Sequence, residues 1–272
     1  MKPDIHEKTP KSLLNAGSGF LEGYSHTLNP YTGCSYACSY CYVRRMPVAL
    51  FRKQEWGSWV DVKQGAAELL KKELAKARKK GPVTIFMSSA TDPYQPVEKQ
   101  AEVTRSLLEV MAENLPDFLF VQTRSPLVAR DVELFQRFGN RIRISMTVET
   151  DREDIRRLFA PKAPPIPARL NALRRIVEAG VPAQATVAPF LPSTEGFADV
   201  LADVVDRVCV DDYRLGDGSG GKRTERLGIP ELYEANGLQE WYEPDAYLRV
   251  VERLREVLPA EKVLVSQQGF LP

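Results

Sequence analysis

The sequence has few of the residues and patterns on which several common protein classes depend. Only two of its 272 residues are histidines, His6 and His26, so a metal site built from several histidines is excluded. No apolar run approaches the roughly 20 residues that a membrane-spanning helix needs. The charged N-terminus is not followed by the apolar stretch of a secretory signal. We therefore expect a cytoplasmic protein with no membrane partner, in a reducing compartment.

An excess of charge of one sign is also missing. The chain has 37 Lys and Arg against 36 Asp and Glu, a formal net charge of +1. This balance argues against a protein built mainly to coat nucleic acid or an acidic membrane. With 43% hydrophobic and 27% charged residues the composition is that of a folded globular protein, and a core of this size needs no disulfides.

Apolar runs typical of strands alternate along the chain with helical spacing. The predicted strands are 26–32, 83–87, 118–121, 142–148, 183–188, 207–210 and 262–265, and the predicted helices are 61–80, 101–113, 128–138, 168–179 and 247–258. Such alternation requires parallel strands joined by helical crossovers, in an α/β fold. About six units predict a full or partial (β/α) barrel, with an open doubly wound sheet as the alternative.

The polar, glycine-containing residues 1–24 are predicted to form an N-terminal arm, and residues 25–272 a single (β/α) barrel domain that includes the C-terminal helix. In both candidate architectures the functional residues belong at the carboxyl ends of the strands.

Three of the four cysteines lie within eight residues, directly after the first predicted strand. Cys34, Cys38 and Cys41 have the spacing C-x3-C-x2-C. Cysteines this dense in a reducing compartment usually bind metal. A [4Fe-4S] cluster held by three thiolates leaves one iron open for a small molecule, which a catalytic cluster needs. The alternative is a structural zinc site that takes Cys209 as its fourth ligand.

The motif C-x3-C-x-aromatic-C, with Tyr40 as the aromatic residue, resembles the signature of the radical S-adenosylmethionine (SAM) enzymes. The resemblance narrows to the spore photoproduct lyase-like members. It rests on the motif together with 29–34, 89–94, 123–125, 169–170, 178–180 and 187–189, in this order along the chain.

This resemblance implies a partial (β/α)6 radical SAM barrel with parallel strands. It implies that Cys34, Cys38 and Cys41 bind a [4Fe-4S] cluster and that SAM binds its open iron. It further implies that a one-electron reductant such as flavodoxin or ferredoxin supplies the electron that cleaves SAM. The resulting 5′-deoxyadenosyl radical would abstract hydrogen from a substrate, which the sequence leaves open as a small molecule, a peptide or a nucleic acid.

The chemistry of SAM suggests roles for polar residues near the strand ends. Ser89 and Asp92 follow the second strand and offer acceptors for the SAM ammonium group; the alternative is a turn capped by these side chains. Arg124 and Arg169 are suited to its carboxylate, although isolated arginines are usually solvated.

Two further residues complete the predicted SAM site. Ser145 faces away from Ile144 and Met146 by strand parity and is a candidate for the ribose if it points into the barrel. The motif position of Tyr40 implies that its backbone lies near the adenine.

One position departs from the lyase pattern. Spore photoproduct lyases have a cysteine, thought to return a hydrogen atom to the product radical, where this chain has Ala90. DNA photoproduct repair by that route is therefore in doubt. Cys209 on a later strand is a weak candidate for the same role, and a lone strand cysteine is more often a buried apolar residue.

Two segments suggest other functions. The glycine-rich loop 216–221 contains G-x-G-x-x-G, but the polar segment after it favours a loop at the barrel mouth over a phosphate site. The basic run 71–80 is interpreted as the solvated face of a helix. The competing hypothesis is a non-catalytic, zinc-stabilised barrel that binds nucleic acid through this run.

Overall fold

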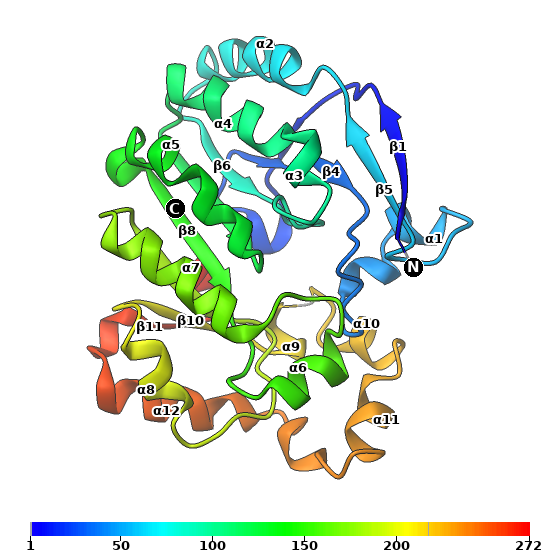
Figure 1. The fold of residues 1–272 in the computed structure, drawn as a ribbon, viewed down its shortest axis with the longest axis vertical. Coiled ribbons are helices and arrows are strands. Elements are labelled where there is room, and N and C mark those ends of the chain that lie inside the picture. Colours follow the sequence, from blue (N-terminus) through cyan, green and yellow to red (C-terminus); the bar gives the residue numbers. More distant parts are fainter. Residues whose placement is uncertain (1, 217) are drawn as a thin grey trace.

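An eight-stranded sheet forms the centre of the computed structural model, which describes residues 2–216 and 218–272 (Figure 1). In spatial order its strands are β11 (Val263–Val265), β10 (Val208–Val210), β9 (Ala183–Val187), β8 (Ile142–Thr147), β7 (Phe118–Thr123), β6 (Thr84–Met87), β3 (His26–Leu28) and β2 (Leu14–Ala16). All neighbours are parallel except β2 and β3.

The strand order decides between the two predicted architectures. From β3 to β11 the parallel strands follow one another in chain order, with no reversal. A doubly wound sheet reverses direction at a switch point, whereas a (β/α) barrel adds each strand on the same side of the last. The prediction of a partial (β/α) barrel is confirmed, and the doubly wound alternative is wrong.

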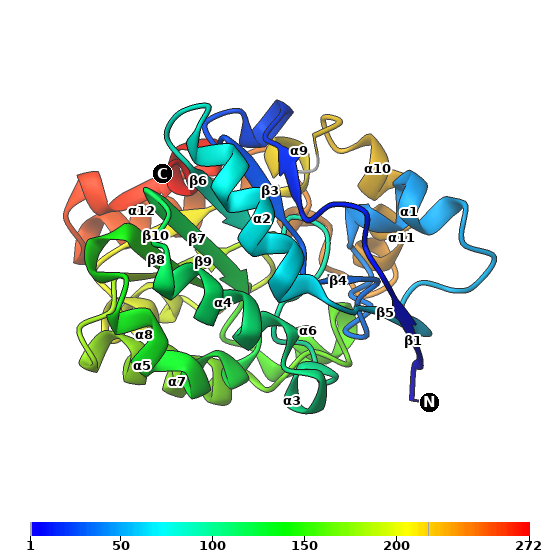
Figure 2. The same cartoon turned by 90° about the horizontal axis from the view of Figure 1, so that it is seen from above.

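Helices cover the outer face of the curved sheet (Figures 1 and 2). These helices are α2 (Ala66–Arg78), α4 (Val103–Glu113), α5 (Val132–Gln136), α7 (Ile166–Glu178), α8 (Phe197–Ala202) and α12 (Ala246–Val257). Helices α6 (Glu153–Phe159) and α11 (Ile229–Glu234) instead pack in an apolar cluster with residues of the cysteine loop. Four-residue helices lie in connections: α1 (Pro47–Leu50), α3 (Glu98–Ala101), α9 (Tyr213–Gly216) and α10 (Lys222–Glu225). Among the helices so described, none is long and apolar enough to cross a membrane.

Alternate side chains of each strand enter two different cores, as a period of two requires. Ile85, Met87, Ile144 and Met146 pack outward in the main core beneath the helices. Phe86, Phe120 and Cys209 point inward, where Tyr24 and Phe270 join them. This aromatic cluster fills one part of the barrel interior.

Three predicted elements differ from the structure. The predicted strand 26–32 is divided into β3, in the eight-stranded sheet, and β4 (Tyr31–Thr32), in a separate three-stranded sheet. The segment predicted as a helix from residue 61 begins with a strand, β5 (Trp59–Lys63). It is a strand because it pairs with a neighbouring strand on each side, and its side chains Trp59, Val60 and Val62 are buried. These neighbours are β1 (Asp4–Lys8) and β4. The predicted helix 128–138 is a 3-10 helix, Pro126–Asp131, followed by α5.

The N-terminal segment is attached to the rest of the molecule at several points. Besides β1, it contributes β2 and a 3-10 helix, Gly19–Leu21. The Tyr24 hydroxyl donates a 2.6 Å hydrogen bond to the carbonyl of Phe270, and Gln267 donates one of 2.8 Å to that of Phe20. Of the predicted arm, Met1 lies outside the described residues. The rest joins the two edges of the partial barrel near residues 20 and 270.

Candidate active site

The three clustered cysteines lie in the loop that follows β4. Cys34 comes two residues after the strand, and Cys41 directly precedes a 3-10 helix, Tyr42–Arg45. All three are free thiols and line one cavity of about 530 Å³. Pockets of about 300–1,000 Å³ suit small-molecule ligands and cofactors. The structure thus brings the three cysteines to one cavity, and their binding of a metal stays a prediction.

Buried polar side chains hold the cysteine loop in shape. The side-chain oxygen of Gln95 accepts from the backbone N–H of Ser35 at 2.9 Å, and its nitrogen donates to the carbonyl of Gly33 at 3.0 Å. Arg44 donates to the carbonyls of Ala37 and Cys38 at 2.8 and 3.1 Å. Gly33 has a φ of +85°, and a Cβ there would lie 2.6 Å from the carbonyl of Trp59. Only glycine fits this position.

The three thiols lie close enough together for the charge of one to affect the pKa of another. Burial raises the pKa of Cys34 and of Cys41, the latter to about 11, and the charge of the neighbouring Cys38 thiolate raises both further. Metal binding removes the thiol proton and offsets this repulsion. Across the described ranges no three His, Cys, Asp or Glu side chains are grouped to hold a single metal ion. A cubane cluster has no such requirement, because each thiolate binds a different iron.

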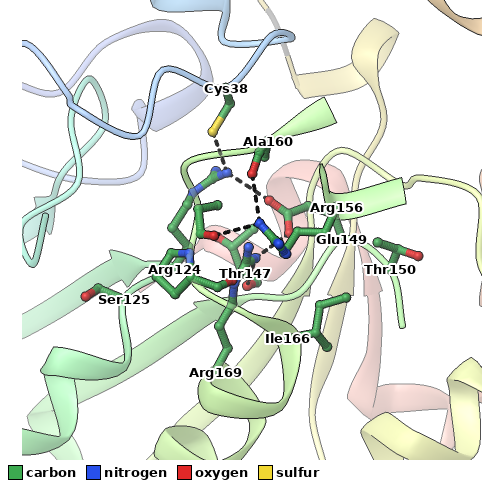
Figure 3. Close-up of polar contacts among 12 residues, drawn as sticks. Cys38, Arg124, Ser125, Thr147, Glu149, Thr150, Arg156, Ala160, Ile166 and Arg169 are labelled. Carbon is green, nitrogen blue, oxygen red and sulfur yellow. Dashed lines mark hydrogen bonds and ion pairs between the residues drawn. The ribbon is translucent and has the colours of Figure 1, made fainter. Parts of the chain in front are cut away.

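Arg124 connects the cysteine loop to a carboxylate that the sequence analysis did not single out (Figure 3). Its Nη1 lies 2.8 Å from each of three acceptors: Cys38 Sγ, the Tyr40 hydroxyl and Glu149 Oε1. The Tyr40 hydroxyl in turn donates to Glu149 Oε1 at 2.6 Å. Arg124 lines the cavity, and its contacts place a cation directly beside Cys38.

Glu149 is the centre of this network. It lies two residues after β8 and is 2% exposed, and Nη1 of Arg169 lies 2.6 Å from its Oε2. Burial alone would raise its pKa, but the charges of Arg169 and Arg124 and the Tyr40 hydrogen bond lower the pKa to about 2. Glu149 is therefore an ionised carboxylate between two guanidinium groups. Its position just after a strand was the signal in the sequence that could have identified it.

Arg169 lies behind the cavity wall. Its side chain is fully buried and also donates to the carbonyls of Thr147 and Pro164, at 3.1 and 2.9 Å. Among the residues that the structure describes it is not part of the cavity lining. Arg124 and Arg169, both predicted to bind the SAM carboxylate, instead form ion pairs with Glu149, and of the two only Arg124 lines the cavity.

Asp92 and Ser89 both line the cavity. Asp92 Oδ1 accepts from the Thr123 hydroxyl at 2.7 Å and from the Tyr94 N–H at 2.9 Å, while Oδ2 accepts from the Arg124 N–H at 2.9 Å. Asp92 therefore ties the end of β6 to the end of β7 and fixes the backbone of Arg124. The hydroxyl of Ser89 accepts a 3.2 Å hydrogen bond from Asn29.

Two other polar atoms in the cavity wall have no hydrogen-bond partner among the described residues. They are the hydroxyl of Ser88 and Oε1 of Gln122, which lie near the ends of neighbouring strands. Ser88 is 6% exposed and has a φ of +80°, a left-handed conformation that is uncommon outside glycine. Buried polar atoms are normally paired. Both therefore fit a cavity whose polar contacts are completed by a bound ligand.

Ser145 faces away from Ile144 and Met146, as strand parity predicted, and is not among the described residues that line the cavity. It is fully buried and hydrogen-bonded to the Thr186 hydroxyl and to Gln184. Tyr40 lines the cavity, with its side chain directed to Arg124 and Glu149.

Cys209 lies apart from the other cysteines. It is fully buried in the inner aromatic cluster with Phe86, Phe120 and Phe270, and a Cβ on Gly269 would come 2.2 Å from its sulfur. Cys209 is absent from the described lining of the cavity. The four-cysteine zinc site is therefore wrong, because its fourth ligand is packed elsewhere.

The glycine-rich loop reaches the same cavity from the opposite wall. Gly216 and Gly218 line it together with Arg223 and Thr224 of α10, while Asp217 lies outside the described residues. The helix that follows has four residues, too short for the terminus of a phosphate loop. The basic run 71–80 places its lysines on the exposed side of α2, and Leu70, Leu74 and Ala77 on the buried side.

Comparison with known proteins identifies the class to which this site belongs. The sequence profile of the Radical SAM superfamily matches residues 28–204, which include the cysteine loop and the strands β6, β7 and β8 that precede Asp92, Arg124 and Glu149. The chain belongs to the Radical SAM superfamily, and membership implies an enzyme.

The curated relatives are uncharacterized proteins. One from Methanocaldococcus jannaschii is 33% identical over 172 residues, 63% of this chain and 62% of the relative. One from Acidianus two-tailed virus is 32% identical over 197 residues, 70% of this chain and 64% of the relative. The chain thus spans less than two thirds of the length of these relatives.

Among solved structures the fold resembles spore photoproduct lyase. The lyase complexed with dinucleoside spore photoproduct has a TM-score of 0.65 and 16% identity, covering 96% of this chain and 81% of the lyase. SuiB of Streptococcus suis bound to S-adenosylmethionine has a TM-score of 0.51 and 12% identity, covering 77% of this chain and 44% of SuiB. At these identities the likeness concerns the fold.

Proposed function

We propose that this protein is a radical SAM enzyme with a [4Fe-4S] cluster bound by Cys34, Cys38 and Cys41. The observation that carries the proposal is that these free thiols share one cavity with Arg124 and with the unpartnered polar atoms of Ser88 and Gln122. When bound, the cluster and SAM would together supply a 5′-deoxyadenosyl radical that abstracts hydrogen from the substrate. The residues of the chain bind, orient and shield these groups.

The residues around the cysteines have separate tasks in this proposal. Gln95 and Arg44 hold the backbone of the loop, so the three thiols are arranged before metal arrives. Arg124 places positive charge beside Cys38, and Glu149 fixes the guanidinium there. Such charge and hydrogen bonding at a cluster sulfur favours its reduced state.

The polar wall of the cavity is proposed to bind SAM. Of the side-chain nitrogens of Arg124, only Nη1 is hydrogen-bonded within the described chain, so the other two are available to a carboxylate. The hydroxyls of Ser88 and Ser89 are suited to the ammonium group, and Gln122 Oε1 to a ribose or adenine donor. Tyr40 supplies backbone at the cavity wall for the adenine. Asp92 and Arg169 do not contact SAM in this proposal. Asp92 holds the backbone of Arg124, and Arg169 holds the Glu149 carboxylate.

The substrate is proposed to occupy the remainder of the cavity. Its wall there includes the apolar side chains of Phe20, Leu21, Phe86 and Phe270 and, opposite, Tyr213 and Arg223. A small molecule, a peptide or a nucleic acid segment remain the candidates. Ala90 lines the cavity where the photoproduct lyases have their cysteine, which disfavours photoproduct repair. The electron is proposed to come from a carrier such as flavodoxin or ferredoxin.

Formation of 5′-deoxyadenosine tests the proposal. The protein is reconstituted anaerobically with iron and sulfide and given SAM and dithionite. Wild type is expected to bind four irons per chain and to form 5′-deoxyadenosine. Cys34→Ala, Cys38→Ala and Cys41→Ala should each lose both, whereas Cys209→Ala, the matched control, should lose neither. Full iron content in any of the three variants would contradict the proposal.

A further inference from the structure

A short helix separates the cluster cysteines from solvent on one side of the molecule. Met46 and Ala49, at the start and on the inner side of α1, pack in one apolar cluster with Cys34 and Cys41. On the outer side of the same segment Val48, Leu50 and Phe51 are exposed. The outer surface of α1 is therefore only one helix away from the thiols.

This outer surface is unusually apolar for a monomer. Phe51 is 85% exposed, Leu50 57% and Val48 37%. Within residues 2–216 and 218–272, no other stretch of four residues has more than one exposed large apolar side chain. Scattered exposed apolar residues are normal, but a contiguous group indicates an interaction surface.

Exposed basic side chains lie on the segments that flank the apolar group. Helix α10 lies beside α1 in both views (Figures 1 and 2). Arg45 donates a hydrogen bond to the carbonyl of Arg226, which joins the segment after the cysteines to the segment around α10. The exposed charges here are Arg45, Lys53, Lys222 and Arg226, against Glu55, Glu225 and Asp4, whose carboxylate accepts a hydrogen bond from Gln54. The whole chain carries a net charge of only +1, so this face is more basic than the average surface.

We infer that this surface, the α1–α10 face (Arg45, Val48, Leu50, Phe51, Lys53, Lys222 and Arg226), docks a small acidic electron-carrier protein. The inference rests on the proposed function and identifies where its electron enters. Aromatic and arginine side chains are the common anchors of protein interfaces, and complementary charge speeds encounter with the partner. One electron passes from the reduced carrier to the cluster, so the carrier is oxidised by one electron and no atom is exchanged.

Arg44 extends the same surface inward. It is half-buried at the base of the α1–α10 face, and its guanidinium donates to the backbone carbonyls of Ala37 and Cys38. A partner seated on this face therefore approaches the cluster loop itself. A cationic, apolar surface next to the cluster ligands is what a transient redox partner of opposite charge requires.

The test compares two electron sources for the same enzyme. The full chain, reconstituted anaerobically, forms 5′-deoxyadenosine from SAM with dithionite or with a reduced bacterial flavodoxin as the probe. In the double variant Phe51→Ser/Lys53→Glu the flavodoxin concentration for half-maximal rate should rise about tenfold. The rate with dithionite should not change. The control Val257→Ser/Arg255→Glu makes the same changes on α12, at the far side of the molecule, and should match wild type (Figure 1).

Titration calorimetry with oxidised flavodoxin measures docking without catalysis. Binding that weakens at higher salt and is about tenfold weaker in the double variant supports the inference. It is overturned if the half-saturating flavodoxin concentration is unchanged, or if the dithionite rate falls in parallel. It is also overturned if wild type is a dimer that Phe51→Ser dissociates, because the face then pairs two copies. No 5′-deoxyadenosine from wild type with dithionite would refute the proposed function instead, and calorimetry would still decide the docking.

Discussion

Arg169 and Glu149 form an ion pair that is closed to solvent: their atoms Nη1 and Oε2 lie 2.6 Å apart, and the side chains are 0% and 2% exposed. The pair joins helix α7 to the end of β8. On the other side of Glu149, Arg124 reaches Cys38. The geometry around Cys38 thus depends on a helix more than 120 residues further along the chain.

Loss of the Arg169 guanidinium should destabilise the protein strongly. In Arg169→Met the buried Glu149 carboxylate loses one of its two cations, and breaking such a pair costs about 3–5 kcal/mol. Arg174→Met, which breaks the exposed pair with Asp203, should cost about 1 kcal/mol or less. Urea denaturation of both variants beside wild type measures the difference. Equal losses would show that burial of the Arg169 pair has no consequence.

The stabilisation from Glu149 should depend on pH. Its pKa is about 2 in the folded protein and ordinarily 4.5, so the folded state favours the ionised form. The contribution is fully present above about pH 4.5 and is lost as the pH falls toward 2. At neutral pH it amounts to about 3 kcal/mol. The free energy of unfolding of wild type minus that of Glu149→Gln should be level from about pH 7 to 5 and shrink below. A constant difference down to about pH 3 would contradict the ionised state.

Replacement of Cys209 should leave the chemistry intact. The side chain fills space against Phe86, Phe120 and Phe270, so Cys209→Ala should cost about 1 kcal/mol through the small cavity it leaves. Bound iron and 5′-deoxyadenosine formation should equal those of wild type. Loss of iron, with the fold retained by circular dichroism, would revive a role for Cys209 as a ligand.

The wild-type enzyme should not repair the spore photoproduct. Ala90 lines the cavity at the position of the lyase cysteine and has no thiol hydrogen to return to a product radical. Incubation of dinucleoside spore photoproduct with the reconstituted enzyme, SAM and dithionite should yield no thymine product by chromatography. Repair at a rate comparable to 5′-deoxyadenosine formation would show that another residue donates the hydrogen.

Local patterns in the sequence predicted most of the fold. Six of the predicted strands coincide with β6 to β11 within a few residues, because buried parallel strands are continuous apolar runs bounded by turns. The strand β5 was missed because Val60-Asp61-Val62-Lys63 alternates only briefly and leads directly into the helical spacing of α2. It is a strand because β1 and β4 pair with it, and such long-range pairing has no local signature.

Agreement was less complete for the candidate site. Tyr40, Ser89, Asp92 and Arg124 reach the cavity because each lies in the cysteine loop or directly after a strand of the parallel sheet. Their contacts with SAM stay a prediction, as do those assigned to Ser145 and Arg169. The sequence contains both Arg124 and Arg169, but it does not show that Arg169 pairs with the buried carboxylate of Glu149 behind the cavity wall.

By itself the sequence determined the chemistry available to this protein: a cysteine motif with the spacing of a three-ligand cluster, carried on alternating strands and helices. Only the tertiary structure decided how the residues are used. It packed Cys209 among aromatic rings, placed Arg169 behind Glu149 and left Phe51 exposed beside the cysteine loop. Spacing along the chain fixes which groups one loop can present together. Burial and pairing depend on segments that meet only after the sheet has formed.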